Sequence, residues 1–180
     1  YNPMTGEYHE ATIGDKGIQL NLKSGESRIL ITSNKPVNEW ELGSKVKVGG
    51  KEAIAAADSK TIDLTANTWK LSFTEDTPKV GETFNLKGVK SWEGLSEKAK
   101  VMMGTGVYET TIKLSKDDAK KQWTIDLGDV RESARIYINN KYVGCAWAVP
   151  YILNCKDALN KGKNTIRIEV TNLPANRIAE

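Results

Sequence analysis

The sequence has a single histidine, His9, and only two cysteines, Cys145 and Cys155, among its 180 residues. None of these residues has the paired spacing of a structural zinc site, which strongly disfavours a Cys/His metal centre. A nucleophile activated by histidine is disfavoured too, because the one histidine stands near the start of the chain. The cysteines could form a disulfide in an oxidising compartment, but two small buried thiols are favoured.

Long hydrophobic runs and a strong charge of one sign are also missing. No apolar run approaches the ~18 residues that a membrane-spanning helix needs, so no membrane span is expected. Twenty-six basic residues against 23 acidic ones leave a net charge of +3, too small and too evenly spread to indicate nucleic acid as a partner. The chain lacks an initial methionine and a signal peptide, and we expect it to be a monomeric piece of a longer protein.

The dominant pattern is an alternation of apolar and polar residues with a period of two, typical of half-buried antiparallel strands. Residues 68–180 carry about seven such segments, which predict an all-β sandwich with two stacked sheets. Asn139 and Asn140 tolerate positive φ and predict a hairpin turn. Helical pattern is limited to a short helix within 92–103 and one turn at 156–160. The predicted inward rows are Trp69, Leu71 and Phe73; Tyr108, Thr110, Ile112 and Leu114; Trp123, Ile125 and Leu127; Ala134, Ile136 and Ile138; and Ile166, Ile168 and Val170.

The beginning of the chain is organised differently. Two alternating segments, 18–22 and 28–33, flank a turn at Ser24-Gly25 and predict a strand pair. Residues 34–67 show little periodicity. We therefore place a boundary near residue 67, with a β-rich N-terminal segment and linker at 1–67, the tail of a preceding domain, and the sandwich at 68–180.

Carboxylates do not form an obvious catalytic pair. Hydrolysis of a glycosidic bond needs two carboxyl groups about 5–10 Å apart, one of them commonly in an apolar setting. Three of the candidates fall on the solvent side of their strands, and two share a short helix face with lysines nearby. The chain alone is therefore predicted not to be catalytic. The candidates are Glu93, Glu97, Glu109, Asp126, Asp129 and Glu169.

Two tryptophans next to turns, Trp92 and Trp147, are the candidate sugar-binding residues. A flat ring on a loop can bury the C–H groups of a pyranose, while amide and guanidinium groups bind its hydroxyls. Asn172, Asn176 and Arg177 supply such groups at the end of the last strand. Alternatively, Trp147 caps one end of the sandwich, and the polar residues satisfy loop carbonyls or a neighbouring domain.

A run of motifs in the second half of the chain has a recognisable order: Ile125-Asp126-Leu127-Gly128, Ala134, Ile136, Asn139-Asn140, Gly144, Trp147, Pro150-Tyr151, Gly162 and Asn164. This order resembles the galactose-binding-like jelly-roll β-sandwich of large glycoside hydrolases, and most of all the C-terminal part of the bacterial α-L-rhamnosidase family. The likeness covers residues 67–178, and the opening residues are similar to the β-rich segment that precedes this domain there. β-Galactosidase and β-glucuronidase relatives share the sandwich type.

The sequence departs from the family pattern at three places. Glu93 follows Ser91-Trp92 where the family often has threonine, Met102-Met103 precede Gly104 where an aromatic is common, and no aromatic follows Asn172-Leu173. Two ring contacts are thus missing.

The resemblance implies a non-catalytic accessory domain of a polysaccharide-degrading hydrolase, because the catalytic carboxylates of such enzymes lie in a separate barrel. Its partners would be glycan, bound weakly, and the catalytic domain of its own parent chain. The alternatives are a purely structural brace for that domain and, least favoured, an enzyme in its own right. The family implies a periplasmic, cell-surface or secreted location. No cofactor is expected to be required, although sandwiches of this type often hold a structural calcium ion in a loop.

Overall fold

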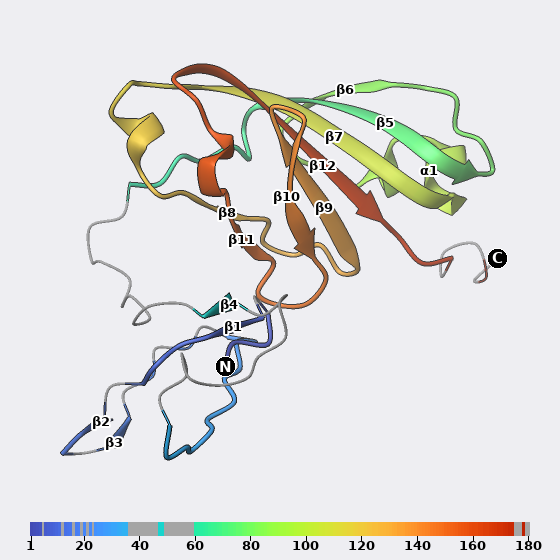
Figure 1. Cartoon of the computed structure of the whole chain (residues 1–180). Helices are drawn as coiled ribbons and strands as arrows, with labels where there is room; N and C mark the ends of the chain where they lie inside the picture. The colour runs from blue at the N-terminus through green and yellow to red at the C-terminus, as the bar shows by residue number, and fades with distance from the viewer. Residues whose placement is uncertain are drawn as a thin grey trace. The chain divides into compact units, whose positions relative to one another are not determined.

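A computed structural model describes residues 1–4, 6–11, 13–15, 17–18, 20, 22, 24–35, 47–48, 60–174 and 178 (Figure 1). The chain forms two compact units, Tyr1–Thr61 and Ile62–Glu180. The sequence places the boundary near residue 67 instead. The structure assigns the preceding residues to the second unit because Leu64 packs against its core, and the Trp69 indole N–H donates to the Leu64 carbonyl at 3.0 Å.

The described residues of the first unit include four two-residue strands. β1 (Glu7–Tyr8) pairs in parallel with β4 (Lys47–Val48), and β2 (Ile13–Gly14) pairs antiparallel with β3 (Gly17–Ile18).

The strand pair predicted at 18–22 and 28–33 is wrong, because none of the described residues from 20 to 35 lies in a strand. Their apolar side chains are exposed: Leu20, Leu22, Ile29, Leu30 and Ile31. Alternation stabilises a strand only where its apolar row is buried, and here it is not.

The second unit is a β-sandwich built on one large antiparallel sheet, with strand order β10-β9-β12-β7-β5-β6 (Figure 1). A smaller antiparallel pair, β8 and β11, forms the second layer. The predicted all-β sandwich is confirmed. The strands are β5 (Thr68–Thr77), β6 (Phe84–Lys87), β7 (Met103–Leu114), β8 (Thr124–Asp126), β9 (Ser133–Ile138), β10 (Lys141–Ala146), β11 (Ile152–Asn154) and β12 (Gly162–Thr171).

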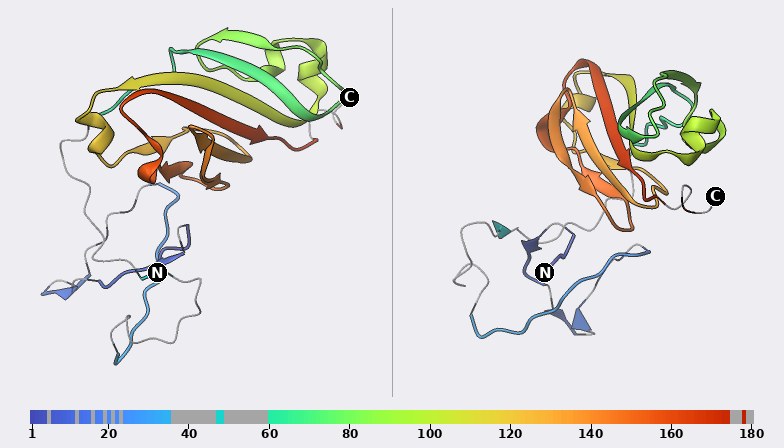
Figure 2. Two further views of the ribbon diagram at one scale, coloured as in Figure 1. Left: turned by 45° about the horizontal axis from the view of Figure 1, so that its top comes forward. Right: turned by 90° about the vertical axis from the view of Figure 1, so that its right-hand side faces the viewer.

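Helical turns cover the rest of the inner face. The short helix α1 (Glu97–Val101) lies beside β5 and β6, away from β8 and β11 (Figure 2), and it follows the 3₁₀ turn η2 (Trp92–Gly94). Two further 3₁₀ turns are η3 (Asp118–Lys120) and η4 (Lys156–Ala158). The short helix within 92–103 and the single turn at 156–160 are thus confirmed. No helix among the described residues is long and apolar enough to cross a membrane.

The predicted inward rows form the core. Leu71, Ala134 and Ile136 are completely buried, and Trp69, Ile138 and Ile166 are nearly so. Phe73, Ile112, Trp123, Ile125, Leu127 and Val170 are partly buried and pack against the same cluster. The sequence identified these residues correctly because strand alternation and burial agree throughout this unit.

A buried amide joins the hairpin to η4. Asn139 and Asn140 have φ of 52° and 64° and connect β9 to β10 as predicted. Asn164 is fully buried, and its side-chain oxygen accepts from the Asn160 backbone N–H and the Asn139 amide, both at 2.8 Å. Its own amide donates to the carbonyls of Asn160 and Gly162. All of these buried polar groups are therefore satisfied.

Candidate functional site

Trp147 begins the connection between β10 and β11 and is 61% exposed. Its neighbour Val149 is 54% exposed, while Tyr151 at the far end of the connection is buried. The Tyr151 carbonyl accepts from the Leu127 N–H at 3.0 Å. The connection is therefore anchored at one end and presents an accessible indole ring at the other, as a sugar platform requires.

Trp92, the second predicted platform, is only 7% exposed, so its ring is not accessible as a platform. The ring meets Phe73 edge-on with centroids 5.9 Å apart and lies 6.2 Å from Tyr108. It also lies directly against Gly106 of β7, where an added Cβ would stand 2.5 Å from its Cζ3 atom. The expectation of a sugar contact at Trp92 is corrected, because the ring is part of the core.

Asn172 joins two strand ends. Its side-chain oxygen accepts from the Gly104 N–H and its amide donates to the Met102 carbonyl, both at 2.9 Å. These bonds hold the end of β12 against the start of β7, and they match the alternative in which Asn172 satisfies loop carbonyls. Asn176 and Arg177 lie outside the described residues.

Trp147 and Asn172 reach the same end of the large sheet. β10 and β12 both pair antiparallel with β9, so they run in the same direction and end at one edge. Ala146 and Val170 are both opposite Ala134, and Trp147 and Asn172 follow within two residues. Two strand spacings, about 10 Å, separate these strand ends.

The sequence did not single out a polar cluster on the outward face of the same sheet, which we call the Arg–Tyr cluster: Arg135, Tyr137, Tyr142, Arg167 and Glu169. The guanidinium carbon of Arg167 lies 4.0 Å from the centroid of the Tyr137 ring, and the Tyr137 and Tyr142 centroids are 5.4 Å apart. Arg167 donates to Glu169 at 2.7 Å. The only sequence signal is that "RIY" and "RIE" occupy alternating polar positions of two strands, whose register the sequence does not reveal.

Neither ionisable group with a strongly shifted pKa belongs to a reactive site. Burial raises the pKa of Tyr108, whose hydroxyl donates to the Lys90 carbonyl at 2.8 Å. Burial also raises the pKa of the Cys155 thiol to about 11, which keeps it protonated and a poor nucleophile. Cys145 and Cys155 are both free, so the favoured pair of thiols is found, although only Cys155 is buried.

Metal ligands do not gather in the described part of the chain. Within those residues, no three His, Cys, Asp or Glu side chains come close enough to hold an ion.

Comparison with known proteins finds similarity to parts of larger glycoside hydrolases. Residues 94–180 match the family described as "Glycosyl hydrolase 2 galactose-binding domain-like". The chain is 29% identical over 174 residues to a protein of Formosa agariphila named "Putative beta-glucuronidase". That match covers 91% of this chain and 15% of the relative, so the chain spans only a small part of the relative's length.

Solved structures show the same fold. A rhamnosidase from Novosphingobium sp. PP1Y superimposes with a TM-score of 0.59 and 23% identity, over 71% of this chain and 12% of that one. A β-glucuronidase from Ruminococcus gnavus gives 0.51 and 16%, over 59% of this chain and 21% of that one. Together with the family match, these structures show that the second unit has a galactose-binding-like β-sandwich fold.

Proposed function

Starting from this galactose-binding-like sandwich, we propose that the chain is a non-catalytic, carbohydrate-binding accessory domain of a polysaccharide-degrading glycoside hydrolase. The match covers only 15% of the Formosa protein, so the remaining 85% lies outside it. This small share supports the proposal. The catalytic domain of the parent chain would occupy such a region. An α-L-rhamnosidase-like parent is favoured by the TM-score of 0.59 to the Novosphingobium rhamnosidase.

The exposed ring of Trp147 is the observation that carries the binding function. The indole is 61% exposed and stands on an anchored connection. It can therefore bury one face of a pyranose without the entropy cost of ordering a loop on binding. Weak binding suffices for this role: a millimolar site corresponds to about −4 kcal/mol. Tethering to a catalytic domain then raises the effective concentration of enzyme at the polymer.

Trp147→Ala tests this function directly. We expect retention of the chain on a glycan matrix to be lost, while the melting temperature stays within a few degrees because the ring is outside the core. Val149→Ala is the matched control, since it shortens a similarly exposed apolar side chain on the same connection and should leave retention unchanged. Equal retention by the wild type and Trp147→Ala would show that Trp147 does not contribute to glycan binding.

A structural brace is the second candidate, and one observation favours it. Trp147, Val149 and Leu173 are all more than half exposed and lie just beyond β10 and β12, which end at the same edge of the sheet. Exposed apolar residues of this kind suit contact with a neighbouring domain. An array of rhamnose-, galactose- and uronate-containing glycans separates the two candidates, because a brace would bind none of them.

The remaining proposals concern the setting of the domain. We expect a periplasmic, cell-surface or secreted parent, and no turnover of aryl glycosides by this chain alone. No cofactor is required for glycan binding, and a structural calcium ion would bind through loop carbonyls and one or two Asp or Glu side chains. Adding EDTA should therefore leave glycan retention in place, even where it lowers the melting temperature.

A further inference from the structure

The outward face of the large sheet carries an excess of positive charge. Strand register and alternating burial place eight charged side chains on this face: the cations Lys70, Lys87, Lys113, Arg135, Lys163 and Arg167, and the carboxylates Glu109 and Glu169. Six cations against two carboxylates leave an excess of four positive charges, whereas the whole chain has a net charge of only +3. One face therefore has a much denser positive charge than the average composition indicates.

The Arg–Tyr cluster is the best-defined part of this face. Glu169 is committed to Arg167 at 2.7 Å, but its other oxygen reaches Nε of Arg135 only at 3.9 Å, beyond hydrogen-bond distance. The Arg135 side chain is 49% exposed. Arg135 is thus half exposed, beside a carboxylate that is already hydrogen-bonded to Arg167.

Arg167 is held in place by its surroundings. Its guanidinium stacks on Tyr137, and its buried Nε has no hydrogen-bond partner among the residues that the structure describes. Glu109 is its cross-strand neighbour, but that carboxylate lies 4.0 Å from Lys70. Arg167 therefore fixes the Tyr137 ring and contributes charge, while Arg135 remains the accessible donor.

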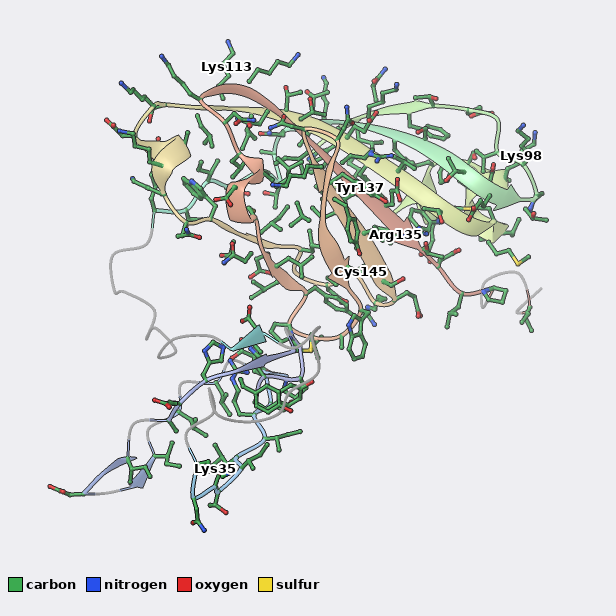
Figure 3. All side chains as sticks on the ribbon, in the orientation of Figure 1. Lys35, Lys98, Lys113, Arg135, Tyr137 and Cys145 are labelled. Atoms are coloured by element: carbon green, nitrogen blue, oxygen red, sulfur yellow. The ribbon has the colours of Figure 1, made fainter. Side chains whose placement is uncertain are left out.

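Tyr142 supplies an apolar surface beside these donors. It pairs across β9 and β10 with Tyr137 and is 54% exposed. A planar guanidinium binds a carboxylate through two parallel hydrogen bonds, and a neighbouring aromatic ring contacts the sugar that bears the carboxylate. Figure 3 shows Tyr137 and Arg135 along β9, with Cys145 on the neighbouring strand β10, where it is paired with Arg135.

We propose that the Arg–Tyr cluster binds the uronic-acid residues of an acidic polysaccharide, with Arg135 holding the sugar carboxylate and Tyr142 contacting the sugar ring. This inference rests on the proposed glycan-binding function and adds the substrate class. Cys145 is paired with Arg135, and Trp147 lies two residues beyond Cys145 in the chain. One polymer chain can therefore extend from the cluster to the indole. Trp147 then contributes to every glycan, and Arg135 to acidic glycans alone.

The test measures retention of the full chain on three polymers: polygalacturonate, dextran sulfate and a neutral galactan. Arg135→Gln should weaken binding to polygalacturonate about tenfold or more, because the variant loses a charge-assisted hydrogen bond to the sugar carboxylate. Binding to the neutral polymer should stay unchanged. Tyr142→Ala should weaken polygalacturonate binding as well. Lys98→Gln, which removes an exposed cation from α1, is the matched control and should change retention less than twofold (Figure 3).

The outcomes separate this inference from the proposed function. If Arg135→Gln behaves like Lys98→Gln, or loses dextran sulfate and polygalacturonate equally, the face attracts anions without recognising carboxylates and the inference is overturned. Neutral-glycan binding that depends on Trp147 without any preference for polygalacturonate overturns the inference and keeps the proposed function. Failure of the folded chain to bind any of the three polymers overturns the inference, and it leaves the proposed function to the wider array.

Discussion

At the scale of single residues, the sequence alone does not distinguish the buried Trp92 from the exposed Trp147. Both stand next to turns, and nothing in their immediate neighbours separates a core ring from an exposed one. Trp92 is buried because Gly106, in another element, has no side chain and lets the indole lie against β7. That contact depends on how η2 folds back over the sheet, which strand periodicity cannot reveal.

Gly106→Ala tests the contact between Trp92 and β7. The new methyl group would stand 2.5 Å from Cζ3 of the Trp92 ring, so the ring or the strand must move. We expect the free energy of unfolding in urea to fall by about 2 kcal/mol, a typical cost of overpacking. Gly94→Ala is the control, because a methyl group there meets nothing within 4 Å. Equal stabilities of the two variants would contradict the packing described here.

The buried thiol of Cys155 predicts a dependence of stability on alkaline pH. An unfolded thiol loses its proton near pH 9, whereas the folded one keeps it to about pH 11. Between these values the folded state binds more protons, so the free energy of unfolding should fall as the pH rises from 9 to 11. Cys155→Ala removes this contribution, and Cys145→Ala, at a partly exposed site, should retain it.

Urea unfolding at pH 8, 9, 10 and 11 checks this prediction. Tyr108 also has a raised pKa and contributes to the slope in every variant, so the informative quantity is the difference between wild type and Cys155→Ala. Parallel curves for the two proteins would show that Cys155 is solvated in the folded state.

At the scale of elements, alternation predicted the strands of the second unit and failed in the first. In "TWKLSF" and "ARIYIN" the apolar rows lie on the same inner face of the large sheet and are buried in its core, so local pattern and burial coincide. In "RILITS" the same pattern has no surface to cover, and Ile29, Leu30 and Ile31 are exposed. The Arg–Tyr cluster was missed for a related reason, because it forms only when β9, β10 and β12 are in register.

Asn164 should be important for the stability of the β9–β10 hairpin and η4. Replacing it with alanine leaves the Asn160 N–H and the carbonyls of Asn160 and Gly162 without their present partner inside the fold. We expect a loss of about 3 kcal/mol in the free energy of unfolding. Asn160→Ala keeps the backbone groups in place and should cost less than about 0.5 kcal/mol. Similar losses in both variants would mean that the side-chain network is not what connects these elements.

At the scale of the whole molecule, the division after Thr61 predicts which fragment folds alone. A chain of residues 62–180 keeps Leu64 against the core and keeps the Trp69–Leu64 hydrogen bond. Its melting temperature should therefore lie within about 2 °C of the melting temperature of the second unit in the full chain. A chain of residues 68–180 loses both contacts and should melt about 5 °C lower or more. If the two fragments had the same melting temperature by calorimetry, the boundary would lie near residue 67 instead.

The proposed function depends on the exposed indole of Trp147 at the edge of the sandwich. In this proposal the domain binds sugar but catalyses no reaction. The most direct measurement is a glycan array probed in parallel with the full chain and with Trp147→Ala, both verified as folded. We predict selective binding by the wild type that disappears in the variant. Silence of the wild type on every glycan, or a pattern that Trp147→Ala leaves unchanged, would contradict the claim that this domain holds polysaccharide through Trp147.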